Sequence, residues 1–115
     1  MNSLTISERR KLSKGILCRV RFKGHSLHVL LTTHAMERMK RWRLTEHDVF
    51  QTLLKPEEVL EGQEGRFIAH RLRGNHVIRV IYEYENGVPT VVTVYNPYQD
   101  RYFLGGGSYA DQIFS

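Results

Sequence analysis

Turn signals divide the second half of the chain into short strands. Asn86-Gly87 stands between two apolar runs, at 76–84 and 90–96, and Gly74-Asn75 stands before the first of them. Asn-Gly is the strongest short hairpin signal, because both central positions of a type I′ turn need positive φ. A glycine-flanked turn also precedes an apolar run at 66–72, so this half predicts an antiparallel meander. Alternation along the last run predicts one shared face for Val91, Thr93 and Tyr95.

The first half adds a strand pair and two helices. Runs rich in Val, Leu, Ile and Phe at 16–22 and 26–31 predict two strands joined by a short turn. A helix is expected over 33–43, capped by its first residue, and Thr45 is expected to cap a second helix that ends at Lys55-Pro56. The predicted fold class is therefore α+β, with two helices packed on one side of an antiparallel sheet.

The two ends of the chain differ in character. Thr5-x-x-Glu8 has the pattern of a capping box and Gly15 that of a helix stop, so a short basic helix is predicted over 6–14. We interpret the chain as one domain in three parts: a basic N-terminal segment 1–15, a core 16–104 and a Gly-hinged tail 105–115. The tail is expected to dock through three apolar residues: Tyr109, Ile113 and Phe114.

Composition limits the classes of protein that fit. A chain of 115 residues suffices for one core, and no apolar run approaches the roughly 18 residues of a membrane span. The first residues lack the pattern of a signal peptide, and Cys18 is the single cysteine. No disulfide framework is possible within the sequence, and we expect a cytoplasmic protein.

The net charge of +5 is unevenly distributed. Residues 1–43 hold eleven Lys or Arg and only two acidic residues, whereas residues 44–115 hold six basic and ten acidic residues. A basic first third is expected of a surface that meets nucleic acid. An ordinary solvated segment, an anionic membrane or an acidic protein partner would account for the same charges.

The helix predicted over 33–43 carries two stripes. Its apolar stripe can dock on a core and contains Ala35, Met39 and Trp42, extended by Met36. The neighbouring stripe places His34, Arg38 and Arg41 together, at i, i+4 and i+7. It sets a proton-transfer group beside two cations, although a solvated basic face would look the same.

Metal and nucleophile chemistry find little support in the residues. His25 and His28 point to opposite faces of a strand, and His70 and His76 flank a hairpin without an evident third ligand. Cys18 lies in an apolar strand, where a buried thiol is the usual outcome. No nucleophile elbow, phosphate loop or dinucleotide motif occurs, and the acid pairs Glu57-Glu58 and Glu83/Glu85 are expected on a solvated surface.

The remaining chemistry is acid–base catalysis on a phosphate, which His, Arg and Tyr perform without a metal or other cofactor. Imidazole exchanges protons near neutral pH, and guanidinium binds phosphate and stabilises developing charge. RNA cleavage needs a base, an acid and such a cation. His34, Arg38 and Arg41 supply these groups, and Arg79 and Tyr95 are the candidates expected from the sheet.

Five runs of the chain resemble the prokaryotic family known as domain of unknown function 4258, over about residues 30–96. These runs are His34-Ala-Met-Glu-Arg38-Met-Lys, Leu44-Thr-Glu-His-Asp-Val49, Lys55-Pro-Glu-Glu-Val59, Gly74-Asn-His-Val-Ile-Arg-Val-Ile-Tyr82 and Val91-Val-Thr-Val-Tyr95. The resemblance implies a RelE/ParE-like toxin fold with a curled sheet, within the barnase–colicin–RelE group of metal-independent ribonucleases. It favours His34 and Arg38 as functional residues and brings in Arg79 and Tyr95. This chain departs from the family pattern at Trp42, where a second arginine is usual.

Two hypotheses follow. The first is a toxin-type endoribonuclease that acts on RNA or the ribosome and needs no cofactor. A cognate antitoxin protein is expected to inhibit it. Its site would comprise His34, Arg38, Arg41, Arg79 and Tyr95. The second is a non-catalytic RelE/ParE-like interaction protein or a basic nucleic-acid-binding module.

Overall fold

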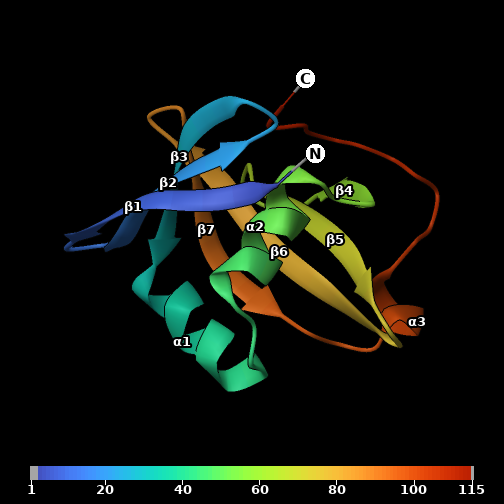
Figure 1. The fold of residues 1–115 in the computed structure, drawn as a ribbon. Helices are drawn as coiled ribbons and strands as arrows, with labels where there is room; N and C mark the ends of the chain where they lie inside the picture. Colours follow the sequence, from blue (N-terminus) through green and yellow to red (C-terminus); the bar gives the residue numbers. More distant parts are fainter. Residues whose placement is uncertain (1–2, 115) are drawn as a thin grey trace.

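A computed structural model describes residues 3–114 as seven strands and three helices. The elements are β1 (Leu4–Leu12), β2 (Gly15–Phe22), β3 (His25–Thr32), α1 (Thr33–Trp42), α2 (Glu46–Leu54), β4 (Glu58–Glu61), β5 (Phe67–Arg73), β6 (His76–Glu85), β7 (Val88–Tyr95) and α3 (Gln99–Tyr102). The strands form one sheet in the order β1-β2-β3-β7-β6-β5-β4 (Figure 1). The predicted α+β class is confirmed.

Two antiparallel meanders make up the sheet, and a single parallel contact between β3 and β7 joins them. The predicted hairpins are confirmed. Asn86 and Gly87 have φ values of 51° and 78°, as a type I′ turn requires. The strand pair at 16–22 and 26–31 is confirmed as β2 and β3, which turn at Lys23-Gly24.

The predicted helix over 6–14 is wrong, because these residues belong to β1 and its turn. β1 pairs along its length with β2, and this tertiary pairing overrides a local pattern with little apolar content. Gly15 does not end a helix. It begins β2 with a φ of 154°, and a Cβ at this position would collide with the Leu31 carbonyl oxygen.

The two main helices begin and end at clear caps. The N-cap of α1 is Thr32, one residue before the predicted Thr33, and its hydroxyl accepts a hydrogen bond from the Ala35 N–H. Arg43 ends α1 in the left-handed conformation. Thr45 and Asp48 form a reciprocal capping box at the start of α2, as expected for the predicted cap at Thr45.

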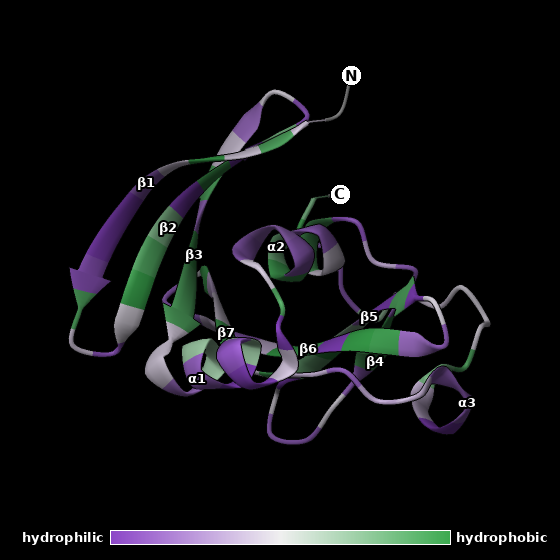
Figure 2. Cartoon of the chain, turned by 60° about the horizontal axis from the view of Figure 1, so that its bottom comes forward, coloured by the Kyte–Doolittle hydropathy of each residue, from purple (hydrophilic) through white to green (hydrophobic). Residues whose placement is uncertain are grey.

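One core joins the sheet to both helices. It includes Leu31, Ala35, Met39, Val49, Phe50, Leu53, Val80 and Val94. Figure 2 shows β1–β3 standing beside α2 while β4–β6 lie below it, so the sheet bends around this helix. Cys18 is fully buried in the core, as predicted, and burial raises the pKa of its thiol to about 11. Within residues 3–114, no helix combines the length and apolarity needed to cross a membrane.

The tail docks as predicted. Phe114 stacks on Phe22 with ring centroids 5.8 Å apart, and Ile113 packs against the same core. Tyr109 forms a parallel bridge to Val59, and the Asp111 carboxylate accepts hydrogen bonds from two sheet tyrosines. Residues 103–114 therefore form part of the folded domain.

A bulge in the β6–β7 pair sets the register of the site. Tyr82 lies opposite Val91, but Ile81 lies opposite Thr93, so β7 holds one extra residue at this point. Val91 consequently leaves the face of Thr93 and Tyr95, and the predicted grouping of these three residues is wrong. Beyond the bulge, Tyr95 lies directly opposite Arg79, and the two share one face of the sheet.

Candidate functional site

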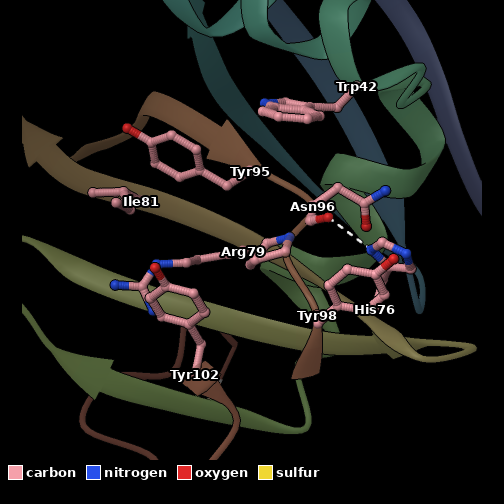
Figure 3. A pocket seen from close by; sticks show the side chains of 9 residues that line it. Trp42, His76, Arg79, Ile81, Tyr95, Asn96, Tyr98 and Tyr102 are labelled. Carbon is pink, nitrogen blue, oxygen red and sulfur yellow. Dashed lines mark hydrogen bonds between the residues drawn. The ribbon is translucent and has the colours of Figure 1, made fainter. Parts of the chain in front are cut away.

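A cavity of about 560 Å³ opens where the end of α1 meets β6, β7 and the segment that leads into α3 (Figure 3). Rings dominate its lining: Trp42, His76, Tyr95, Tyr98 and Tyr102. Arg79 supplies the cation of the lining, and we call this site the aromatic cavity. Such a mixture of rings and one charged group is typical of a ligand site, and the volume lies in the usual range for one.

A buried chain of side chains holds Arg79 from behind. Glu58 on β4 and His70 on β5 are both fully buried and lie on adjacent strands, with Glu58 Oε2 2.7 Å from His70 Nδ1. Arg79 Nη1 lies 3.0 Å from His70 Nε2, and its guanidinium stacks 4.7 Å from the centre of the Tyr102 ring. We call Glu58, His70 and Arg79 together the Glu58–His70–Arg79 chain.

The partners of His70 fix its protonation. A carboxylate only accepts and a guanidinium only donates, so Nδ1 carries the proton and Nε2 accepts from Arg79. Burial lowers the pKa of His70, and the Arg79 charge lowers it further against the opposing pull of Glu58. Burial also lowers the pKa of Arg79 from its ordinary value. The chain therefore consists of a carboxylate, a neutral imidazole and a guanidinium cation.

Glu58 corrects the prediction of a solvated Glu57-Glu58 pair. Glu57 is exposed, but Glu58 accepts hydrogen bonds from the Leu104 and Gly105 N–H groups at 3.1 and 2.9 Å. Burial alone would raise the pKa of Glu58, yet these bonds and the one from His70 lower it below its ordinary value. One carboxylate thus fixes both the chain behind Arg79 and the segment that follows α3.

Three of the five predicted site residues come together. Arg79 and Tyr95 lie opposite each other and both line the cavity. The Arg38 guanidinium lies 5.9 Å from the centre of the Tyr95 ring, although Arg38 does not itself line the cavity. His34 and Arg41 are exposed on α1 and do not line the cavity. Arg41 lies 5.5 Å from the Trp42 ring, and His34 begins the helix one turn before Arg38.

His76 is a site residue that the sequence offered only as a metal candidate. Its Nδ1 lies 2.8 Å from the Asn96 carbonyl oxygen, and its ring stacks on Tyr98 at 4.4 Å (Figure 3). A carbonyl only accepts, so Nδ1 donates and Nε2 of a neutral His76 has a free lone pair. His70 is committed elsewhere, and the described residues contain no cluster of three or more His, Cys, Asp or Glu side chains suited to a metal.

The basic first third of the sequence forms two exposed areas. Arg10, Arg19 and Arg21 are exposed on β1 and β2, and Lys40, Arg41 and Arg43 are exposed at the end of α1. Other cations of this third are paired with acids, Arg9 with Glu46 and Lys14 with Glu85. The second area adjoins Trp42 and hence the aromatic cavity.

The fold and the site define a small α+β domain with a cation-bearing aromatic cavity on its sheet. A family model described as a domain of unknown function (DUF4258) matches residues 31–96, and the chain belongs to this family. The match begins at the end of β3 and runs to the end of β7, so it includes both main helices and most of the cavity. No curated protein and no solved structure matches the chain.

Proposed function

We propose that this protein is a toxin-type endoribonuclease with a RelE-like fold, which cleaves RNA without a metal. The observation that carries the proposal is that Tyr95 lies opposite Arg79 and contacts Arg38, in a cavity that His76 also lines. Two cations, a phenol and an imidazole with a free lone pair are the groups that phosphodiester cleavage requires.

The reaction is a transesterification within the RNA. A base takes the proton of the 2′-hydroxyl, and the 2′ oxygen forms a bond to the adjacent phosphorus. The bond from phosphorus to the 5′ oxygen breaks, and an acid gives that oxygen a proton. The products are a 2′,3′-cyclic phosphate and a 5′-hydroxyl end, with no other reactant consumed.

Each role follows from the surroundings of a side chain. His76 Nε2 takes the proton because Nδ1 is committed to the Asn96 carbonyl. His34 on α1 returns a proton, with Arg38 one turn away to bind the phosphate. Arg79 stabilises the negative charge that develops on the phosphoryl oxygens, since fixed donors act most strongly on charge that develops in the transition state. Arg41 steers the RNA, and Tyr95, whose ring contacts Arg38, donates from its phenol.

The exposed cations supply the docking surface. Phosphate contacts give most of the affinity for nucleic acid and position the strand without reading its sequence. Arg10, Arg19 and Arg21 on the sheet and the cations of α1 would bind RNA or the ribosome. An antitoxin protein with an acidic segment would cover the same surface.

A cleavage assay tests the proposal. Parent protein is incubated with single-stranded RNA in the presence of a chelator, beside H34A, H76A and R38A. His47→Ala on α2 and Lys55→Ala at the end of α2 are matched controls, because both residues are exposed and neither belongs to the proposed docking surface. Cleavage to cyclic phosphate ends is expected for the parent and the controls, is expected to be lost in H34A and H76A, and is expected to fall several-fold in R38A at subsaturating RNA. Parent protein that leaves the RNA intact, or histidine variants that cut at the parent rate, would sink the proposal.

The exposed position of His34 and Arg41 favours a second candidate, a nucleic-acid-binding or ParE-like interaction protein without catalysis. Cations outside a cavity bind a polymer as well as they serve a reaction. RNA binding without any cleavage, together with growth arrest on expression, is the outcome that selects this candidate.

A further inference from the structure

We propose that the aromatic cavity binds a single unpaired nucleobase, with Arg79 and Arg38 holding the phosphate of the same nucleotide. The inference deepens the proposed function and rests on it for the choice of RNA as the polymer. It names what the site recognises, a single-stranded ribonucleotide segment, and it assigns binding roles to Trp42, Tyr98 and Tyr102.

Two tyrosine rings at the cavity are exposed. Tyr98 and Tyr102 are 63% and 38% exposed, although large aromatic side chains are costly to leave in water. Tyr98 is already stacked on His76, so the pair presents a flat surface beside Arg79 (Figure 3). Proteins that bind single strands use such rings as platforms for bases, because every base has a π-face.

Two polar atoms buried at the cavity also point to a ligand. Trp42 Nε1 and Asn96 Oδ1 have no hydrogen-bond partner among the described residues, and both side chains line the cavity. Buried polar atoms nearly always have a partner, and these two would gain one from a ligand that shifts the side chains covering them. One is a donor and the other an acceptor, and the edge of a nucleobase offers both kinds of group.

Charge completes the ligand. Arg79 lines the cavity, and the Arg38 guanidinium lies 5.9 Å from the centre of the Tyr95 ring, which lines it too. Guanidinium groups bind phosphate with two parallel hydrogen bonds, so a ligand with an aromatic ring and a phosphate satisfies every group of the site. A paired duplex does not fit, because its bases are stacked inside the helix and present no free face.

Trp42 makes the test direct, because it is the single tryptophan of the chain and lines the cavity. Its fluorescence is followed while parent protein is titrated with adenosine 5′-monophosphate, and separately with ribose 5-phosphate. Because stacking of one base contributes about 1–3 kcal/mol, the nucleotide should bind about 5- to 140-fold more tightly than the sugar phosphate. Equal affinities would mean that the protein recognises only the phosphate, which contradicts the nucleobase assignment. Absence of binding would also overturn the proposal.

Variants locate the base. Tyr98→Leu should weaken nucleotide binding about tenfold and Tyr98→Phe should restore it, because stacking needs the ring and not the hydroxyl. Tyr109→Leu is the matched control, an exposed tyrosine on the tail. Nucleotide affinity unchanged by Tyr98→Leu contradicts the assignment.

The outcome is separable from that of the proposed function. If the nucleotide binds as expected but RNA stays intact, the endoribonuclease proposal fails and the nucleotide site stands. If RNA is cleaved equally well as a single strand and as a duplex, and Tyr98→Leu cuts at the parent rate, the nucleobase assignment fails while the function stands.

Discussion

Arg38 reaches the Tyr95 ring from the surface of α1, whereas Arg79 reaches the same site from the interior of the sheet. Arg38 is held by its helix and by the ring. Arg79 is held by a neutral His70, which is itself held by a buried carboxylate that also binds the segment after α3.

The difference separates two tasks that one charge can perform. A cation whose only contact is a ring attracts phosphate, but its side chain loses conformational entropy when it binds. A cation that is fixed before the substrate arrives needs little reorganisation at the moment of reaction, and such groups give the largest electrostatic stabilisation of a transition state. We therefore expect Arg38 to govern affinity and Arg79 to govern rate.

The largest expected effect comes from removing the carboxylate behind Arg79. Glu58→Ala leaves the His70 N–H and two backbone N–H groups buried without an acceptor. A buried donor left without its acceptor usually costs about 1–3 kcal/mol, and here three donors lose theirs. Denaturant unfolding should show a loss of this size, and Glu58→Gln a smaller one. Glu61→Ala, on the exposed end of the same strand, is the control. An equal loss of unfolding free energy in Glu58→Ala and Glu61→Ala would show that the buried carboxylate contributes no more to stability than an exposed one.

Acid should weaken the contribution of the Glu58–His70–Arg79 chain to stability. Below the ordinary pKa values of 6.5 for His70 and 4.5 for Glu58, the unfolded chain binds protons that the folded chain resists, because both pKa values are lowered by folding. The contribution of these groups to stability is thus complete above about pH 6.5 and is lost as the pH falls.

Melting temperatures between pH 7.5 and 5 check this expectation. His70→Gln keeps a donor for Glu58 and an acceptor for Arg79 but does not titrate. It should flatten the pH dependence between 6.5 and 5. A parent protein whose melting temperature stays level across that range would contradict the assigned protonation.

Arg38→Ala should change affinity modestly. Removal of a single phosphate contact usually lowers the salt dependence of binding by about one unit of slope or less. RNA affinity measured at several salt concentrations should fall several-fold with a shallower slope, while the rate at saturation changes little. If Arg38→Ala instead lowered the cleavage rate at saturation strongly and left RNA affinity unchanged, Arg38 would have the transition-state role that we propose for Arg79.

The smallest effect is expected at the surface pair of Arg9 and Glu46. The two side chains are 50% and 29% exposed and meet at 2.6 Å. Because exposed ion pairs contribute about 0.2–1 kcal/mol, Arg9→Gln should lower the free energy of unfolding by no more than that. Unfolding at low and high salt measures it, and a loss as large as that of Glu58→Ala would remove the contrast between buried and exposed charges.

Local signals in the sequence predicted much of the fold. The Asn86-Gly87 turn and the Thr45 cap carry their own stereochemistry, so neighbours in the sequence suffice to find them. The strand β1 could not be found in this way, because its conformation depends on pairing with β2. The parallel contact of β3 with β7 likewise joins residues about 60 positions apart and has no local signal.

The site was predicted in part for the same reason. Counting residues outward from the two-residue turn at Gly74-Asn75 places His70 opposite Arg79, so the sequence suffices to predict this pairing. The contact of Arg79 with Tyr95 could not be predicted in this way, because the bulge at Ile81/Tyr82 shifts the register by one residue. Burial of Glu58 could not be predicted either, because a buried carboxylate depends on partners that lie far away in the chain.

In the proposed reaction, the Glu58–His70–Arg79 chain fixes a cation for RNA cleavage. The single-turnover rate of cleavage at saturating protein, with a chelator present, tests this role when parent protein is compared with Arg79→Lys. Lysine keeps the charge but loses the planar fork, and removal of one fixed donor typically costs about 10²–10³-fold in rate. We predict a loss of that size with RNA affinity nearly unchanged. A rate equal to that of the parent would contradict the role of Arg79.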